Sequence, residues 1–327
     1  MAAVSIIVNP ASAGGRTGRR MRHLVPMLRQ ILGSQCTITT TEHRGEATRL
    51  AFEAAMGGCE LLVSVGGDGT ANEIANGIAP GGVSVNPHCR LGILSSGTGQ
   101  GLARSLGLPP DVESQIRLIG SGLERTIDLG CLEWTAPEGR RSWMFLSECQ
   151  AGIGGAVVRE AERRGKRLGG ALCFGLTALH QAWCCPNIPI ELVLDRTELI
   201  DGPVLGVSVG NGSRTGGGMR LTPGARLDDG LLDLLVFPAL SRLERLKTFS
   251  SIYSGAHLND PRFRYRTTRR IELTSPVRVP LAADGELLGE LPAVITIHRA
   301  ALRVCAVPTD QETYDEHAGQ HLAEVAV

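Results

Sequence analysis

Glycines and acidic residues recur in this chain at turns whose composition suits phosphate and metal chemistry. One such turn reads Gly-Gly-Asp-Gly-Thr-Ala-Asn-Glu over residues 66–73 and follows the aliphatic run 61–65. Glycines leave backbone N–H groups uncovered, so an anion can approach, and the start of a following helix adds positive potential. The Asp68 carboxylate would repel phosphate unless a divalent cation or its water lies between them. The turn therefore indicates a nucleotide–Mg²⁺ site. An ordinary strand-to-helix turn would also account for two or three glycines, and the GxxxxGKS/T pattern is absent.

Further turns of this kind follow other strand-like runs. Small residues and glycines occupy 9–16, 95–104 and 210–219, each after a short apolar run. Two such turns at the strand ends of one α/β unit could face one crevice. Aspartates stand in the later turns 226–233 and 283–286. An acidic turn with carbonyl groups suits Mg²⁺, which prefers oxygen ligands, although a hairpin turn uses the same Asp-Gly pair.

The hydrophobic pattern predicts the elements that position these turns. Short aliphatic or β-branched runs at 4–8, 36–41, 61–65 and 91–94 predict strands, and the segments 21–32 and 46–56 predict helices between them. The alternation ends near Asp128, beyond which strand-like runs with turn breaks dominate. We therefore expect an α/β domain over 1–129 and a β-rich domain over 130–308, which ends in a strand over 302–307. The acidic segment 309–327 is expected to be a tail.

Bulk composition narrows the classes of function. The chain has 327 residues, a formal net charge of zero and 4% aromatic residues, which argues against a nucleic-acid partner. Nine cysteines without a CxxC pair predict buried thiols in a reducing compartment. No secretory signal is evident, and no apolar run reaches the roughly 18 residues that a transmembrane helix needs. We expect a cytoplasmic protein without a transmembrane segment.

One segment of the second part has the composition of a membrane contact. Five basic residues between 159 and 167 precede the apolar stretch 168–183, which ends in Trp183. A basic cluster beside an apolar helix is what an interfacial contact uses, whereas a core helix with a solvated basic face would give the same pattern. The alternation of arginine and aromatic residues over 262–266 leaves the same two interpretations open.

Taken in order, the turns resemble those of the diacylglycerol kinase catalytic family, which includes bacterial lipid kinases and the sphingosine and ceramide kinases. The matches fall at 9–14, 66–73, 97–104, 211–218, 226–233 and 284–286, and the resemblance runs from Val4 to Pro308. NAD kinases carry a similar glycine–aspartate turn but account less well for 216–218 and 284–286. The resemblance implies a three-layer, NAD-kinase-like α/β nucleotide-binding domain followed by a mainly β, β-sandwich domain. It also implies that the last strand, 302–307, returns towards the first domain.

The resemblance also implies roles for individual residues. Asp284 would be the general base, Glu286 would orient the acceptor or the metal, and Asp68 would hold Mg²⁺ through water. The residues implied to bind the nucleotide are Asn9, Ser12, Ala13, Thr41, Gly66, Gly67, Asp68, Gly69, Thr70, Asn72, Gly97, Thr98 and Glu286.

Metal ligands are implied in two places. Asp128 would be a second carboxylate near the Mg²⁺ of the nucleotide, with a turn or capping aspartate as the alternative. A structural metal would be held by the Asp229 carboxylate and the carbonyls of Arg226 and Leu231. The chain departs from the family at Ala13, where a glycine is usual, and at 100–101, where Gln-Gly replaces the Asn-Asp of many members.

These matches predict an ATP- and Mg²⁺-dependent lipid kinase. Its acceptor would be a hydroxyl of a diacylglycerol-like or sphingoid-like lipid, reached by peripheral contact with a membrane surface, and a homodimer is left open. Two alternatives stand beside this prediction. One is a lipid- or nucleotide-binding member of the family without turnover, and the other is a kinase for a soluble acceptor, as in the NAD kinases.

Overall fold

The computed structural model describes residues 3–96, 100–164 and 170–308, which form two compact units. The first unit comprises 1–97, 106–127 and 301–327, and the second comprises 98–105 and 128–300. The predicted tail, 309–327, and the predicted site residues Gly97 and Thr98 lie outside the described residues.

A parallel sheet forms the centre of the first unit. Its strand order is β2-β1-β3-β4, and the last residues of β17 pair in parallel with β4. Every residue of β3 is buried, which explains why its sequence is continuously aliphatic rather than alternating. The strands are β1 (Val4–Val8), β2 (Thr37–Thr40), β3 (Leu61–Gly66), β4 (Arg90–Ser95) and β17 (Ala293–Val304).

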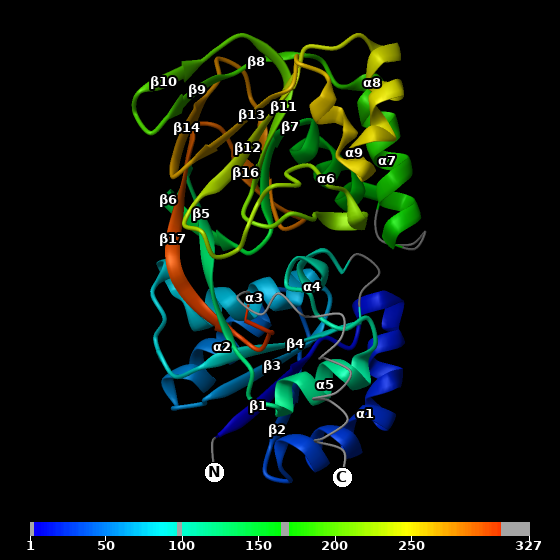
Figure 1. Ribbon diagram of the computed structural model, residues 1–327, viewed down its shortest axis with the longest axis vertical. Coiled ribbons are helices and arrows are strands. Elements are labelled where there is room, and N and C mark those ends of the chain that lie inside the picture. The colour runs from blue at the N-terminus through cyan, green and yellow to red at the C-terminus, as the bar shows by residue number, and fades with distance from the viewer. Residues whose placement is uncertain (1–2, 97–99, 165–169, 309–327) are drawn as a thin grey trace. The chain divides into compact units, whose positions relative to one another are not determined.

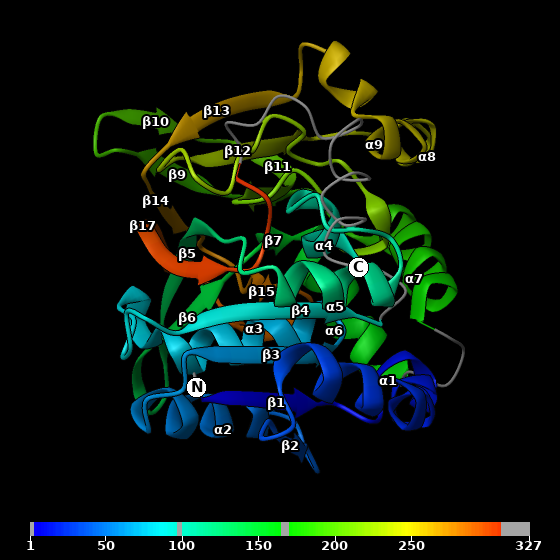
Figure 2. The same ribbon diagram turned by 60° about the horizontal axis from the view of Figure 1, so that its bottom comes forward.

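Helices cover both faces of this sheet (Figures 1 and 2). Helix α1 (Arg16–Leu32) packs against α5 (Val112–Gly120), whereas α2 (Glu46–Met56) packs against α3 (Asp68–Ile78). Strands β2 and β3 lie on opposite sides of β1, so the chain moves from β1 to one neighbouring position and then crosses over β1 to the other. Because crossover connections are right-handed, this reversal places α1 on one face and α2 and α3 on the other. The unit therefore has the three layers that we expect.

The second unit is a β-sandwich. One antiparallel sheet has the order β13-β12-β11-β7-β15-β16, with the short β8 beside β11. The other layer contains β10-β9-β14-β17 and the β5–β6 hairpin. Side chains from both layers, among them Phe145, Leu192, Leu234 and Ile271, form one buried core. The further strands are β5 (Arg125–Ala136), β6 (Gly139–Phe145), β7 (Glu148–Gly152), β8 (Ile188–Pro189), β9 (Glu191–Leu194), β10 (Glu198–Ile200), β11 (Pro203–Gly210), β12 (Leu232–Pro238), β13 (Arg264–Thr268), β14 (Arg270–Thr274), β15 (Pro280–Ala283) and β16 (Glu286–Glu290).

Helices also pack on one side of this sandwich (Figure 1). Helix α6 (Ile153–Arg164) lies on β7, β11 and β15 and packs against α7 (Gly170–Cys184). Helix α7 in turn packs against α8 (Arg242–Phe249), which precedes the short α9 (Ser251–Ser254). The sequence predicts only the segment now seen as α7, because α6, α8 and α9 are short or strongly polar. Within the described ranges, no helix combines the length and apolar character needed to cross a bilayer. The predicted fold class, an α/β unit followed by a β-sandwich, is confirmed.

Candidate functional site

The predicted nucleotide turns meet at the carboxyl edge of the parallel sheet in the first unit. Backbone bonds extend the sheet into these turns: Asn9 donates to the Val65 carbonyl at 2.9 Å, and Thr41 donates to the Val8 carbonyl at 2.8 Å. The order in which the chain adds strands to the sheet reverses between the parallel strands β1 and β3, which are followed by the turn 9–15 and by the start of α3. Ligands of open α/β sheets bind at such a reversal, beyond the carboxyl ends of the strands.

Asn9 ties the first turn to the start of α3. Its side-chain amide donates to Thr70 Oγ1 at 3.1 Å, and its side-chain oxygen accepts from the Ala11 N–H at 3.1 Å. Two of the predicted nucleotide-binding residues, Asn9 and Thr70, are thus in direct contact. The contact fixes the turn after β1 against the turn after β3.

A network of hydroxyl groups, which the sequence analysis missed, links three of these turns. Ser12 Oγ lies 2.5 Å from Thr17 Oγ1, and Thr17 Oγ1 lies 2.7 Å from Ser96 Oγ. Ser96 also donates to the Gly66 carbonyl at 3.2 Å. Ser96 directly precedes the glycine turn that begins at residue 97, so its position in the sequence could have identified it as a site residue. Thr17 lies among arginines at the start of α1, where no spacing singles it out.

Glycines leave the start of α3 open to an anion. A side chain at Gly66 would place its Cβ 2.5 Å from Thr70 Oγ1, so that position requires glycine. At Gly67, the N-cap of α3, an added Cβ would meet no atom within 4 Å, and glycine supplies no side-chain cap to the helix. Asp68 is the first residue of α3. The turn therefore presents backbone and the positive helix end, with a carboxylate beside them.

Other predicted nucleotide residues have structural partners. Thr41 Oγ1 donates to the Val8 carbonyl at 3.4 Å, at the same sheet edge. Asn72 is buried within α3, and its side-chain oxygen accepts from the Asn76 amide at 3.2 Å. Glu73 lies in the same motif and accepts from the Ala47 N–H at 3.2 Å, which links α3 to the start of α2.

The second unit contains a turn built around Asp284. Asp284 and Gly285 have φ values of 45° and 78° and join β15 to β16, as in a type I′ hairpin turn. The Asp284 carboxylate accepts three backbone N–H bonds, from Leu146 at 2.6 Å, Ser147 at 2.9 Å and Glu148 at 3.0 Å. The Asp284 N–H donates to the Glu148 carbonyl at 2.9 Å. Three donors strongly favour an ionised carboxylate.

A second carboxyl group, Glu148 on β7, adjoins this turn and was not predicted. Burial and the charge of Asp284 together raise the pKa of Glu148 to about 8, against the lowering effect of the bond from Gln150. The Gly216 N–H also bonds to Glu148. Of two adjacent carboxyl groups, one is therefore kept neutral and the other ionised.

The predicted metal ligands of the second unit come together, with Asp128 among them. The Asp128 carboxylate accepts from the Gly230 N–H at 2.6 Å and from the Ala300 N–H at 2.7 Å. The Asp128 N–H donates to the Leu227 carbonyl at 2.6 Å. Asp128 thus belongs to the same unit as the 226–231 turn and braces it.

The 226–231 turn itself offers oxygen ligands only. Asp229 Oδ1 accepts from the Leu231 N–H at 3.0 Å, and the Arg226 side chain is 3.5 Å from Asp228. One carboxylate among backbone carbonyls is a donor set that fits a hard cation. In the part of the chain that the structure describes, no three or more His, Cys, Asp or Glu side chains cluster as a metal site.

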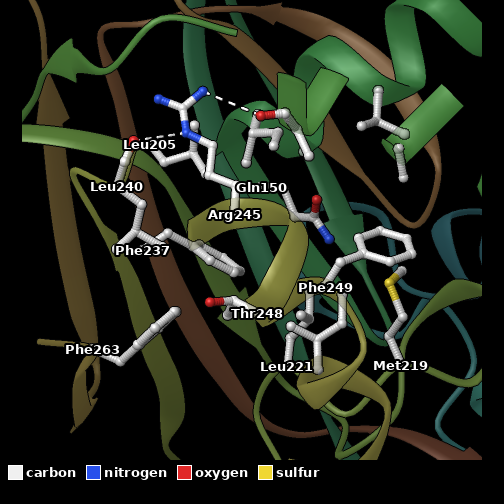
Figure 3. Close-up of a pocket in the computed structure, with 16 residues that line it drawn as sticks. Gln150, Leu205, Met219, Leu221, Phe237, Leu240, Arg245, Thr248, Phe249 and Phe263 are labelled. Carbon is white, nitrogen blue, oxygen red and sulfur yellow. Dashed lines mark hydrogen bonds between the residues drawn. The ribbon is translucent and has the colours of Figure 1, made fainter. Parts of the chain in front are cut away.

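An apolar pocket with a cavity volume of about 100 Å³ lies in the second unit between α6, α7 and α8 and the strands beneath them. Figure 3 shows phenylalanine rings and aliphatic chains forming most of its wall, with Gln150 and Arg245 among the few polar groups. Gln150 also donates to the Glu148 carboxyl group. A chain of contacts within one unit therefore leads from the pocket wall through Glu148 to Asp284.

Arg245 holds the pocket wall together. Its guanidinium is buried and donates to the Leu240 carbonyl at 2.9 Å and to Asn187 Oδ1 at 2.8 Å. It also donates to the carbonyls of Ala182 and Cys185 at the end of α7. Burial lowers the pKa of Arg245. Because a helix C-terminus attracts cations, this arginine fastens α7 to α8.

Comparison with known proteins identifies the family. Residues 3–132 match the model of the diacylglycerol kinase catalytic domain, and residues 147–306 match that of the YegS C-terminal NAD kinase beta sandwich-like domain. A probable YegS-like lipid kinase of Cronobacter sakazakii is 31% identical over 93% of this chain and 96% of its own length. The chain belongs to the family of diacylglycerol kinases and YegS-like lipid kinases. The resemblance stated from the sequence is thus confirmed.

Two further relatives extend the comparison. A diacylglycerol kinase of Bacillus subtilis is 27% identical over 88% of this chain and 90% of its own length. The crystal structure of a putative diacylglycerol kinase from Bacillus anthracis has a TM-score of 0.76 at 23% identity and covers 94% of this chain and 95% of its own. The structural likeness supports the fold of the family.

Replacing Glu148 by glutamine tests the neutral carboxyl group. Because the folded-state pKa lies above the unfolded value, Glu148 contributes stability below about pH 4.5 that is lost as pH rises to about 8. Glu148→Gln should remove this loss, so its free energy of unfolding should rise relative to wild type between pH 5 and 8 by a few kcal/mol at most. Urea unfolding at pH 5 and at pH 8 measures the difference in free energy of unfolding, with Glu191→Gln on the surface as control. An unchanged pH slope would show that Glu148 is ionised throughout.

Ala13 gives a second prediction. Its φ is +52°, in the left-handed region, whereas Ala11 has an ordinary φ of −78°. Ala13→Gly should raise the free energy of unfolding by about 1 kcal/mol or less, because relief of backbone strain exceeds the added entropy of the unfolded chain. Ala11→Gly should lower it instead. Chemical denaturation of both variants provides the measurement, and equal destabilisation would contradict strain at residue 13.

Proposed function

We propose that this protein is an ATP- and Mg²⁺-dependent kinase that phosphorylates a hydroxyl of a diacylglycerol-like or sphingoid-like lipid. The observation that carries the proposal is the contact chain in the second unit, which joins an apolar pocket to the Asp284 turn through Gln150 and Glu148. An apolar chain in the pocket would bring a polar headgroup towards a carboxylate turn. The family adds the kinase activity.

The first unit supplies the nucleotide side of the proposal. The backbone of 66–70, the start of α3 and the Asn9–Thr70 contact offer amide and hydroxyl groups to phosphate oxygens. Bound Mg²⁺ would neutralise charge on the β- and γ-phosphates, and Asp68 would hold it through water. The Ser12–Thr17–Ser96 network keeps these turns in place before the nucleotide arrives.

The second unit supplies the acceptor side. The resemblance assigns proton removal to Asp284, but its three amide bonds stabilise the anion and weaken it as a base. We therefore propose that Asp284 shapes the turn and accepts a hydrogen bond from the lipid hydroxyl. Glu286, two residues along the same turn, would take the proton. Phosphoryl transfer through a loose transition state needs positioning and charge stabilisation more than early deprotonation.

The lipid tail is assigned to the apolar pocket. Its wall carries few polar groups, which suits the apolar chain of a lipid. A soluble, strongly polar acceptor would gain little from such a wall. This is the feature that favours a lipid over the acceptor of an NAD-kinase-like enzyme.

One observation favours the alternative of a family member without turnover. A Cβ at Gly101 would lie 3.1 Å from the Thr215 carbonyl oxygen, so the aspartate of many members fits here only if the backbone shifts. Gln100 has a φ of +47°, a conformation that suits asparagine better than glutamine. If the missing carboxylate is essential, the protein would bind nucleotide and lipid without transferring phosphate.

Kinetics of Glu286→Gln and Asp284→Asn separate the proposed roles. Glu286→Gln should lower kcat by about 10²–10⁴-fold with little change in nucleotide affinity, because it removes only the proton acceptor. Asp284→Asn should lose activity because the turn is distorted: the asparagine NH₂ group would face the backbone N–H donors of residues 146–148. Transfer of labelled phosphate from ATP to diacylglycerol in detergent micelles gives the rates. Near-wild-type transfer by both variants, with the fold intact, would exclude this turn from the reaction.

Filling the pocket tests the assignment of the lipid tail. Ala178 on α7 lines the pocket, so Ala178→Phe should lower kcat/KM for long-chain acceptors by about tenfold and affect short-chain ones much less. Leu199→Phe places a similar ring at an exposed position on β10 and serves as control in detergent micelles. Equal losses for long and short chains would place the tail elsewhere.

A further inference from the structure

The outer face of α7 is exposed and lacks charge. Its solvent-facing side chains are those of Leu176, Leu179, His180, Trp183 and Cys184, which recur with helical spacing. Leu176 is 61% exposed and Trp183 is 43% exposed. A helix stripe that faces water normally carries Asp, Glu, Lys or Arg, and this one carries none of them.

The inner face of the same helix is apolar as well. Ala178 and Ala182 line the pocket, and Thr177 is fully buried. The described side chains of α7 therefore include no Asp, Glu, Lys or Arg on either face. An outer face of this composition is better matched by a partly apolar surface than by water alone.

Helix α8 continues this surface and adds positive charge. Leu243 is 66% exposed, Arg242 lies over the Trp183 ring at 5.5 Å, and Lys247 is exposed one turn further along. The acid of this helix, Glu244, is engaged by Arg262 at 2.6 Å and by Ser241. Leucines and a tryptophan beside two cations are the composition of an interfacial membrane contact.

Helix α6 contributes charges of both signs near this surface. Arg159 and Arg163 are exposed, and α6 packs against α7. Glu160 lies 3.5 Å from Arg163, and Glu162 is exposed beside it. Among the α6 side chains that the structure describes, these charges roughly cancel, so of the described residues those of α8 add the positive charge next to the apolar stripe.

We propose that the outer surface of α7 and α8, formed by Leu176, Leu179, Trp183, Arg242, Leu243 and Lys247, binds the surface of a bilayer that contains anionic lipids. The choice of a bilayer over a protein partner rests in part on the proposed function, because the opposite sides of both helices enclose the pocket assigned to the lipid tail. Leucine and tryptophan would enter the headgroup region, and the two cations would meet anionic headgroups. A second copy of this chain is the rival occupant.

Vesicle binding without ATP tests the proposal. The wild-type protein should co-sediment with vesicles of phosphatidylglycerol and phosphatidylcholine, less so with pure phosphatidylcholine and less at high salt. Leu243→Glu and Leu179→Glu should each lower the partition coefficient about five- to tenfold. The matched control is Leu199→Glu on β10, where the leucine is 59% exposed in the same unit, and it should bind like wild type.

Fluorescence locates the contact. Trp183 is one of three tryptophans, and its emission should shift to shorter wavelength on anionic vesicles. Trp183→Phe should abolish most of that shift while keeping most of the binding, since phenylalanine is also apolar. A shift that persists in Trp183→Phe would overturn the proposed surface.

Two further outcomes would also overturn the proposal. One is equal vesicle binding by Leu243→Glu and Leu199→Glu, and the other is a lipid-free wild-type dimer that Leu243→Glu converts to a monomer. Kinase assays in detergent micelles keep this proposal separate from the proposed function. Leu243→Glu should be active in micelles and impaired on vesicles, whereas a wild-type protein that binds vesicles but never phosphorylates lipid would contradict only the kinase assignment.

Discussion

The acceptor side of the second unit depends on one half-buried carboxylate, that of Asp284, and on the three backbone amides that donate to it. Asp284 sits in a left-handed turn conformation and receives the N–H groups of residues 146–148. These bonds join the β15–β16 hairpin to the start of β7. They also set the state of the neighbouring carboxyl group, because a second negative charge beside Asp284 would be costly and Glu148 is buried. Gln150 donates to the Glu148 carboxyl group and also lines the apolar pocket, so it connects the two.

In the first unit, as at Asp284, backbone N–H groups are available to stabilise negative charge. Phosphate would be met by backbone amides, a helix start and hydroxyl groups. This agrees with a chain whose formal net charge is zero. The cost of bare glycine turns is flexibility, and the Asn9–Thr70 and Ser12–Thr17–Ser96 contacts offset it by tying neighbouring turns together. Each unit thus uses peptide groups as its main polar ligands.

The fold class and the turns could be predicted from the sequence because both depend on short local patterns of residue types. Aliphatic runs before glycine turns gave β1, β3 and β4, and the Asp-Gly pair gave the hairpin at Asp284. Ala13 was noticed as a departure from the family, and the structure gives its physical meaning as a left-handed backbone.

Contacts between segments that are distant in the chain could not be predicted from local sequence patterns. Glu148 becomes a member of the site only because β7 pairs with β15, more than a hundred residues along the chain. Thr17 joins the nucleotide edge only through Ser96 on another strand end. The pocket is likewise formed by α6, α7 and α8 together, and two of these helices were not predicted. No periodicity of a single segment contains that information.

The central claim is that the acceptor is a lipid whose chain lies in the apolar pocket. The most direct test incubates the purified protein with ATP, Mg²⁺ and a total lipid extract supplemented with soluble alcohols and NAD, and identifies the products by mass spectrometry. The account predicts a new phosphate monoester of a long-chain lipid, with the soluble compounds unchanged. Phosphorylation of a soluble acceptor with the lipids untouched would contradict it.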